Sequence, residues 1–328
     1  MPLHIGPVTV DPPVLLAPLA GITDLPFRKL VSSFGAGLVV SEMVASQEMV
    51  QFKPGVREKA ELGFGVENTS VQIAGREPEW MKRAARIVED NGARIIDINM
   101  GCPAKKVTSG LSGSALMRDL DHALTLIEAV VAEVSIPVTL KTRLGWDDSS
   151  LNALELANRA EGAGVQMVTI HGRTRCQFYK GKADWEAIRA IKEGISIPVI
   201  ANGDITDSTS ARTALRQSEA DGVMVGRGAQ GRPWQVAQIA HDLFGTPKPS
   251  IPSGQDYIDM VIGHYQDMLS FYGTTLGGRV ARKHLGWYMD NANTKPDVRK
   301  RILTERDPNA VIKNLQIALC RNESGVAA

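Results

Sequence analysis

The chain has few cysteines and few aromatic residues: three cysteines and 5% aromatics in 328 residues. Cys102, Cys176 and Cys320 are scattered and odd in number, which argues against a disulfide scaffold and indicates a reducing, cytoplasmic compartment. Because no CxxC pair occurs and the six histidines are dispersed, we expect no metal site. No apolar run reaches the length of a membrane span and no signal-peptide pattern opens the chain, so we expect no membrane attachment.

An excess of charge of one sign is also lacking, since 37 Lys and Arg face 36 Asp and Glu for a formal net charge of +1. Such a balance does not by itself indicate a nucleic-acid-binding protein. Locally, however, Lys and Arg outnumber Asp and Glu from Arg279 to the end of the chain. A basic surface confined to this region therefore stays open. The sequence does not give the oligomeric state, and a monomer is the working expectation.

Eight short apolar runs, most of them followed by amphipathic helix-like segments, occupy the first two thirds of the chain. Apolar runs without alternation are typical of parallel strands buried on both faces. Eight β–α units predict an α/β fold of the (β/α)8 TIM-barrel type. A doubly wound sheet is the rival, but no GxGxxG motif follows the first run. The runs are residues 14–18, 38–42, 70–75, 95–100, 138–143, 167–172, 198–204 and 222–227.

Two segments flank these units. The N-terminal "LHIGPVTVDPPV" alternates and turns at Gly6-Pro7, which predicts a small hairpin at the bottom of the barrel. Residues 245–254 are rich in Pro, Gly and Ser and predict a linker, beyond which the pattern is helical only. We therefore predict a barrel domain over residues 1–244 and a C-terminal all-helical domain over residues 255–328.

The ends of the predicted strands are unusually polar. In a TIM barrel the carboxyl ends of the strands meet on one face, where active sites lie. One His or Asn at a strand end would usually cap a loop, but polar residues at nearly every strand end favour an active site. The residues are Glu42, Gln72, Asn99, Cys102, Lys141, Arg143, His171, Arg173, Asn202, Asp204 and Arg227.

The loops after the last two runs, "ANGDI" and "VGRGAQG", indicate the class of ligand. Their glycines let backbone N–H groups approach an anion, and Arg227 adds a charged fork. The same glycines could simply make tight turns. Because the loops after strands seven and eight are the usual phosphate site of such a barrel, we expect a phosphorylated ligand.

Lys141 ends a buried strand, and a buried charge needs a partner. An electron-rich ring that becomes anionic on reduction would supply one, with His171 over the same ring. An ion pair with Glu42 across the barrel mouth is the alternative.

The motifs "APLAGITDLPFR", "VQIAG", "DINMGCPAKKV", "VTLKTRLGW", "TIHGRT", "IPVIANGDI", "GVMVGRGAQGRPW" and "ARKHLGWY" together resemble the tRNA-dihydrouridine synthases, most closely the bacterial B-type branch. The likeness runs in order from about residue 13 to residue 290, with Leu19 where the family commonly has Met. It implies an FMN enzyme that reduces the C5–C6 bond of particular D-loop uridines in tRNA, with NADPH as electron source. The alternatives are a small-molecule FMN oxidoreductase of the dihydropyrimidine or dihydroorotate type and a non-catalytic RNA-binding protein.

The resemblance also assigns residues. Cys102 is the general acid that protonates uracil C5 after hydride from reduced FMN adds to C6; an ordinary thiol, with a pKa of about 8.5, is mostly protonated at pH 7. The Gly- and Ser-rich segment after it is expected to be a mobile loop that closes over a flipped uridine. For Arg143 a salt bridge at the barrel mouth is equally open. The residues placed against FMN are Pro18, Leu19, Ala20, Gln72, Lys141, His171, Asn202, Gly203, Asp204, Gly226 and Arg227; those placed against tRNA are Asn99, Arg143, Arg173, Arg282 and Lys283.

Overall fold

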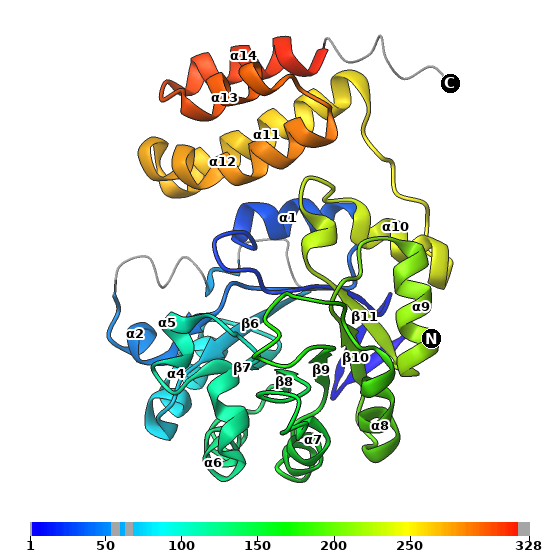
Figure 1. Cartoon of the computed structure of the whole chain (residues 1–328). Helices are drawn as coiled ribbons and strands as arrows, with labels where there is room; N and C mark the ends of the chain where they lie inside the picture. Colours follow the sequence, from blue (N-terminus) through cyan, green and yellow to red (C-terminus); the bar gives the residue numbers. More distant parts are fainter. Residues whose placement is uncertain (1, 54–59, 63–67, 321–328) are drawn as a thin grey trace.

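The computed structural model describes residues 2–53, 60–62 and 68–320 and shows a ring of parallel strands beneath a layer of helices (Figure 1). Strand β4 pairs with both β3 and β6, which closes the ring and confirms the predicted barrel. A short ninth strand, β5 (Val44–Ala45), extends the edge beside β6. The barrel strands are β3 (Val14–Leu16), β4 (Leu38–Val40), β6 (Thr69–Ala74), β7 (Ile96–Met100), β8 (Val138–Arg143), β9 (Val168–His171), β10 (Val199–Asn202) and β11 (Gly222–Val225).

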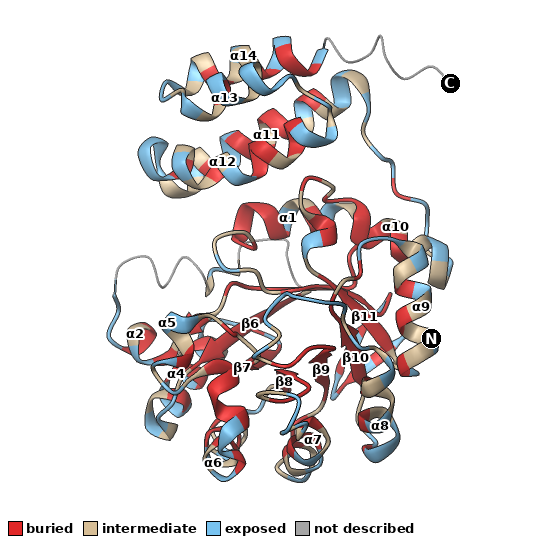
Figure 2. Ribbon diagram, in the orientation of Figure 1, coloured by how far each residue is buried: buried red, intermediate tan, exposed pale blue. Residues whose placement is uncertain are grey.

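Helices surround the barrel because each presents an apolar stripe to the outer face of the strands. In α6, for example, Ala123, Leu126, Ile127 and Val130 are buried, and the Asp119 side chain caps the first turn by accepting from the His122 N–H. Figure 2 shows buried residues along the strands and on the inward sides of the helices. The helices are α1 (Leu25–Phe34), α2 (Ser46–Val50), α4 (Pro78–Asp90), α5 (Lys105–Thr108), α6 (Leu120–Val131), α7 (Ala153–Gly162), α8 (Glu186–Gly194), α9 (Ser208–Ser218) and α10 (Gln235–Phe244), with 3-10 turns η1 (Gly113–Arg118) and η2 (Arg227–Ala229).

The predicted N-terminal hairpin is present as β1 (Leu3–Ile5) and β2 (Val8–Val10), which pair antiparallel. Its buried side chains belong to one apolar cluster with residues from the amino-terminal half of the barrel interior, including Leu15, Ile200 and Met224. The hairpin therefore closes the lower end of the barrel. Interior positions nearer the carboxyl ends of the strands are polar. One end of the barrel is therefore closed by apolar packing, and the other presents polar side chains.

Four helices follow the barrel: α11 (Gly254–Tyr272), α12 (Thr274–Asn291), α13 (Pro296–Thr304) and α14 (Pro308–Cys320). They share an apolar cluster of their own, and residues 245–253, within the predicted linker, form neither helix nor strand. The Phe27 ring of α1 contacts His284 of α12 at a centroid distance of 4.7 Å, which connects the helices to the barrel. That residues 1–244 and 255–328 are separate domains stays a prediction. Among the described residues, no helix is long and apolar enough to span a membrane.

Candidate active site

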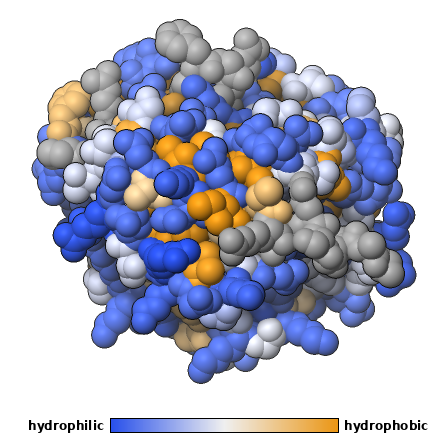
Figure 3. Space-filling model, turned by 90° about the horizontal axis from the view of Figure 1, so that it is seen from above, coloured by the Kyte–Doolittle hydropathy of each residue, from blue (hydrophilic) through white to orange (hydrophobic). Residues whose placement is uncertain are grey.

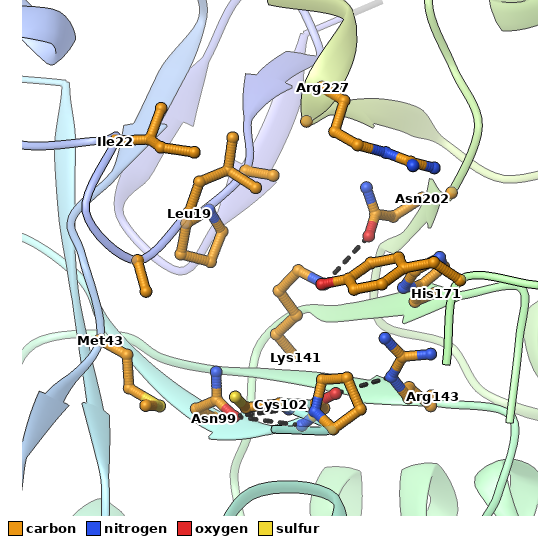
Figure 4. Close-up of a pocket in the computed structure, with 18 of the residues that line it drawn as sticks. Leu19, Ile22, Met43, Asn99, Cys102, Lys141, Arg143, His171, Asn202 and Arg227 are labelled. Carbon is orange, nitrogen blue, oxygen red and sulfur yellow. Dashed lines mark hydrogen bonds between the residues drawn. The ribbon is translucent and has the colours of Figure 1, made fainter. Parts of the chain in front are cut away.

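A cavity of about 780 Å³ opens at the carboxyl ends of the barrel strands (Figure 4). The register of the sheet explains why it is polar: Asn99 and Lys141 are paired neighbours on β7 and β8, and Arg143 and His171 on β8 and β9. Side chains two residues apart on a strand share a face. All residues predicted to hold the cofactor line this cavity, as do the predicted acid Cys102 and two of the five residues predicted to bind RNA. These lining residues are Pro18, Leu19, Ala20, Gln72, Asn99, Cys102, Lys141, Arg143, His171, Asn202, Gly203, Asp204, Gly226 and Arg227.

Lys141 lies in the wall of the cavity and is 9% exposed. Its Nζ donates to Asn202 Oδ1 at 3.0 Å, and Asn202 Nδ2 donates to the Met224 carbonyl at 2.8 Å, which fixes the orientation of the amide. Burial and the charge of Arg143 lower the pKa of Lys141 to about 8. The carboxylate of Glu42, the alternative partner, accepts from the Gly21 N–H at 2.6 Å. A buried amine with an amide as its neutral partner suits an anionic ring in the cavity.

His171 is buried beside Lys141 and surrounded by positive charge. Burial, together with the charges of Lys141, Arg143, Arg173 and Arg227, holds its pKa well below 6.5. The imidazole is therefore neutral at pH 7. Arg173 Nη1 lies 3.4 Å from Nε2 of His171, and because a guanidinium can only donate, Nε2 is the accepting nitrogen.

The loops after β10 and β11 form the far end of the cavity. Gly203 has φ +109°, and a Cβ there would lie 2.6 Å from Cδ2 of His171, so only glycine fits this position. Asp204 receives hydrogen bonds from Arg173 at 2.9 and 2.5 Å and from Arg227 at 3.1 Å. Backbone N–H groups beside a guanidinium are the elements of an anion site.

Arg173 differs in position from what the sequence predicted. It is 1% exposed, and its guanidinium donates to Asp204 and to the carbonyls of Lys180 and Gly181. The described residues that line the cavity do not include it. Arg173 therefore ties the loop after β9 to the loop after β10, and its contact with a bound nucleotide stays a prediction.

Arg143 lines the cavity, and its guanidinium is also hydrogen-bonded to backbone carbonyls of the protein. Its Nε donates to the Gly101 carbonyl at 2.7 Å, and its Nη1 donates to the carbonyls of Thr174 and Phe178 at 3.1 and 3.0 Å. The partners are thus backbone carbonyls of two loops, in place of the carboxylate that a salt bridge would need. Contact of Arg143 with a bound nucleotide stays a prediction.

Cys102 follows β7 and is half-buried in the cavity wall. Its N–H donates to Asn99 Oδ1 at 3.0 Å, and its carbonyl accepts from Ser114 N and Oγ at 3.1 and 2.8 Å. The segment expected to be a mobile loop contains α5 and η1, and its Ser114 is hydrogen-bonded to the Cys102 carbonyl; its mobility stays a prediction. Gly113, at φ +59°, permits this contact, because a Cβ there would lie 2.9 Å from the Cys102 carbonyl oxygen.

The pattern of the dihydrouridine synthase (Dus) family matches residues 15–324. The chain belongs to the dihydrouridine synthase family. A relative from Rhodobacter capsulatus named "Probable tRNA-dihydrouridine synthase" is 61% identical over 326 residues, which is 99% of this chain and 100% of the relative. The "tRNA-dihydrouridine synthase B" of Vibrio vulnificus is 44% identical over 303 residues, covering 91% and 92%. The family, its B-type branch and an enzymatic, flavin-dependent activity are as the sequence predicted.

Solved structures support the barrel of this dihydrouridine synthase. Histamine dehydrogenase from Rhizobium sp. 4-9 aligns with a TM-score of 0.56 at 15% identity, over 81% of this chain and 50% of that one. A morphinone reductase variant aligns with a TM-score of 0.53 at 14% identity, over 73% and 89%. At such low sequence identity, these two alignments support the fold alone.

Two aromatic residues at the mouth of the cavity of this dihydrouridine synthase were not among those predicted from the sequence. Phe178 and Tyr179 both line it and are 43% and 47% exposed. The guanidinium carbons of Arg143 and Arg227 lie 5.7 and 5.2 Å from the centre of the Tyr179 ring. Adjacent aromatics in "CQFYKG", in a chain with so few, were the available signal.

Arg282 and Lys283 lie on α12, outside the set of described residues that line the cavity. Lys283 nevertheless reaches the barrel, since its Nζ would be 3.1 Å from a Cβ at Gly21, in the loop that carries Leu19 and Ala20. The helical layer thus contributes a positive charge at the edge of the cavity. Among residues 2–53, 60–62 and 68–320, no three metal-ligating side chains come together as a metal site.

Proposed function

We propose that this chain reduces particular uridines of the tRNA D-loop to 5,6-dihydrouridine, with FMN in the cavity and NADPH as the electron source. Membership of the dihydrouridine synthase family and the names of its curated relatives support the reaction and the RNA substrate. The observation that carries the assignment to this cavity is that the thiol residue Cys102 and the buried amine of Lys141 line one space.

The cavity fits FMN by its chemistry. Gly203, Gly226 and Arg227 provide close backbone and a guanidinium for the phosphate, and Lys141 provides a cation for the ring. Reduced flavin, when bound, supplies the hydride that adds to uracil C6. Lys141 then holds a positive charge beside the ring system, and the neutral His171 offers a hydrogen bond without adding a further charge.

Cys102 supplies the proton. After hydride addition, negative charge on the uracil is relieved when an acid protonates C5. The hydrogen bonds of its N–H to Asn99 and of its carbonyl to Ser114 fix its backbone on both sides. Because both anchors are formed in this structure, the fold itself holds the backbone of the thiol residue in place.

Phe178 and Tyr179 extend the site to the nucleotide. A uridine must leave its stack to enter the cavity, and aromatic faces compensate for lost stacking. Arg143, Arg227 and Tyr179 lie together at the entrance, where the phosphate of an extruded nucleotide would pass. These residues would receive the substrate, and Arg173 would organise the loops around them.

The helical layer distinguishes tRNA from a small pyrimidine as the substrate. Lys283 and Arg282 lie on α12, and Lys283 reaches the rim of the cavity. The face seen from above in Figure 3 is largely hydrophilic, with apolar residues gathered near its centre. The positive charges of Arg282 and Lys283 suit a polyanion held by backbone contacts, whereas a small-molecule oxidoreductase has no need of them. We also infer a monomer acting in the cytoplasm, where its free thiols stay reduced.

The test uses the purified full chain and tRNA from cells that lack dihydrouridine. We expect denaturation to release FMN, and NADPH to support formation of dihydrouridine in the D-loop, mapped by mass spectrometry. NADH in place of NADPH tests the electron source. Reduction of free uracil or orotate without reaction on tRNA would favour the small-molecule alternative and contradict the proposal.

A further inference from the structure

A row of buried polar side chains runs from the barrel interior to the backbone of Cys102. Asp97 and Asn99 lie on one face of β7, and Gln72 is the paired neighbour of Asp97 on β6. Asp97 Oδ2 accepts from Gln72 Nε2 at 2.6 Å, and Gln72 Oε1 accepts from Asn99 Nδ2 at 2.8 Å. Asn99 Oδ1 accepts from the Cys102 N–H at 3.0 Å. Three consecutive hydrogen bonds thus connect Asp97 to the thiol residue.

The groups at the two ends of this row, the Cys102 N–H and the Asp97 carboxylate, allow only one orientation of the Asn99 and Gln72 side-chain amides. A backbone N–H can only donate, so Asn99 must turn its oxygen toward Cys102 and its nitrogen toward Gln72. Gln72 must then present its oxygen to Asn99 and its nitrogen to Asp97, whose oxygens accept. An amide turned the other way would set two nitrogens or two oxygens against each other inside the barrel.

Asp97 takes part in this row without touching the cavity. It is 2% exposed, and its second oxygen, Oδ1, accepts from Thr139 Oγ1 at 2.6 Å. Burial raises its pKa, while hydrogen bonds from Thr139 and Gln72 and the charge of Lys141 oppose the rise. A buried carboxylate is costly for stability and an apolar residue could fill the same space. The presence of the carboxylate therefore calls for a role other than packing.

We propose that Asp97 is a positioning residue that, as an obligatory acceptor, holds the Gln72 and Asn99 amides in one orientation and through Asn99 sets the position of Cys102. The inference deepens the proposed function, since it rests on the role given there to Cys102. Without the acceptor, a buried N–H of Gln72 loses its partner and the amide is free to turn. Asn99 then loses the oxygen that faces its nitrogen, and the hold on the Cys102 N–H weakens.

Three variants distinguish loss of the hydrogen-bond acceptor at position 97 from changes in side-chain volume and charge. Asp97→Leu removes the acceptor at similar size. Thr139→Val is the matched control, because it leaves the carboxylate and its bond to Gln72 in place. Asp97→Asn is the conservative rescue: its oxygen can accept from Gln72 while its nitrogen donates to Thr139, whose hydroxyl turns toward the Ile96 carbonyl, 3.4 Å away.

The first readout is the rate at which iodoacetamide alkylates each cysteine of the purified full chain, resolved by peptide mass spectrometry. Asp97→Leu should change the rate at Cys102 on the order of fivefold or more, while Asp97→Asn and Thr139→Val stay within about twofold. The exposed Cys176 and Cys320 should react as in the unsubstituted protein, which reports an intact fold.

The second readout is turnover on tRNA. Asp97→Leu should lower kcat on the order of tenfold with KM for tRNA unchanged, and Asp97→Asn should restore it. If Asp97→Leu does not fold, Asp97→Val replaces it, since valine suits a strand and likewise offers Gln72 no acceptor. Unchanged alkylation of Cys102 and unchanged kcat in either variant would overturn the proposal. Because alkylation needs no tRNA chemistry, its outcome stands even if Cys102 proves not to be the acid.

Discussion

Nζ of Lys141 lies 3.0 Å from Oδ1 of Asn202, an amide whose nitrogen is already committed to the carbonyl of Met224. The amine is thus held by a neutral group inside the barrel wall. An ionic partner placed in the cavity would interact with Lys141 strongly, because little water screens it.

Replacing Lys141 by Met should weaken FMN binding at least about tenfold and lower the reduction potential of the flavin that remains bound. The reason is that the positive charge beside the ring is lost while the length of the side chain is kept. Fluorescence titration with FMN and a spectroelectrochemical titration measure both effects. Lys192→Met, which removes a lysine paired with Asp221 outside the cavity, is the control. An unchanged flavin potential in Lys141→Met would contradict the assignment.

The lowered pKa of Lys141 predicts the direction in which FMN affinity changes with pH. Burial lowers this pKa to about 8, so the flavin-free protein loses the positive charge as the pH rises through 8 instead of near 10.5. FMN affinity should therefore fall between pH 7 and 9, above the range in which the FMN phosphate itself ionises, at a pKa of about 6. Lys141→Arg keeps its charge in this range and should show a flatter profile. A wild-type affinity that rises between pH 7 and 9 would show that Lys141 does not hold the anionic ligand.

The pKa of His171 predicts the contrasting behaviour. Since burial and four neighbouring cations hold it well below 6.5, this imidazole should contribute no step in FMN affinity between pH 6 and 8. A His171→Gln variant, which keeps a neutral side chain, should follow the same pH profile as the unsubstituted protein. A step near pH 6.5 that disappears in His171→Gln would mean that the residue is protonated in the site.

Alanine substitutions at Gly203, in the loop after β10, and at Gly92, after α4, form a matched pair that tests the proposed phosphate site. Both have positive φ, +109° and +87°, so alanine is strained at either. Only at Gly203 does the new Cβ meet a neighbour, since it would lie 2.6 Å from His171 Cδ2, whereas nothing lies within 4 Å of it at Gly92. Gly203→Ala should lower the free energy of unfolding by about 1–3 kcal/mol more than Gly92→Ala, and it should impair FMN binding. Equal effects in urea unfolding and equal FMN affinities would contradict this reading of the loop.

The fold was predictable from the sequence because parallel strands buried on both faces leave continuous apolar runs. The cavity followed from the same fact, since the residues after each run meet at one rim. Contacts between distant loops were not predictable. The ion pair of Arg173 with Asp204 joins the loops of neighbouring strands, and no local pattern shows that it withdraws Arg173 from the cavity.

The segment after Cys102 shows the limit of composition as a guide. Gly and Ser predicted a soft loop, yet Ser114 binds the Cys102 carbonyl and Gly113 allows the approach. Phe178 and Tyr179 were missed for a related reason, because a loop carries no periodicity to mark which side chains face the site. Local chemistry selects such residues as candidates, and only tertiary contacts show what they do.

Cys102→Ala should keep FMN bound and lose dihydrouridine formation by about 10²- to 10⁴-fold, the usual contribution of a general acid. Rapid mixing of the reduced enzyme with tRNA, followed by mass spectrometry of the product, measures the loss. Cys176→Ala removes an exposed thiol in the loop after β9 and should leave the rate unchanged. If Cys102→Ala retains full activity, the proton comes from another group.

Lys283→Glu should weaken tRNA binding and flatten its dependence on salt, because Lys283 brings positive charge from α12 to the rim of the cavity beside Gly21. Oxidation of NADPH by a small electron acceptor needs no RNA and should continue. Arg94→Glu is the control, since this exposed residue precedes β7 at the opposite end of the barrel. Filter binding at several salt concentrations compares the tRNA affinity of Lys283→Glu with that of Arg94→Glu. A loss of tRNA affinity of the same size in Arg94→Glu would attribute the effect to net charge, and an unchanged affinity in Lys283→Glu would move the RNA surface away from α12.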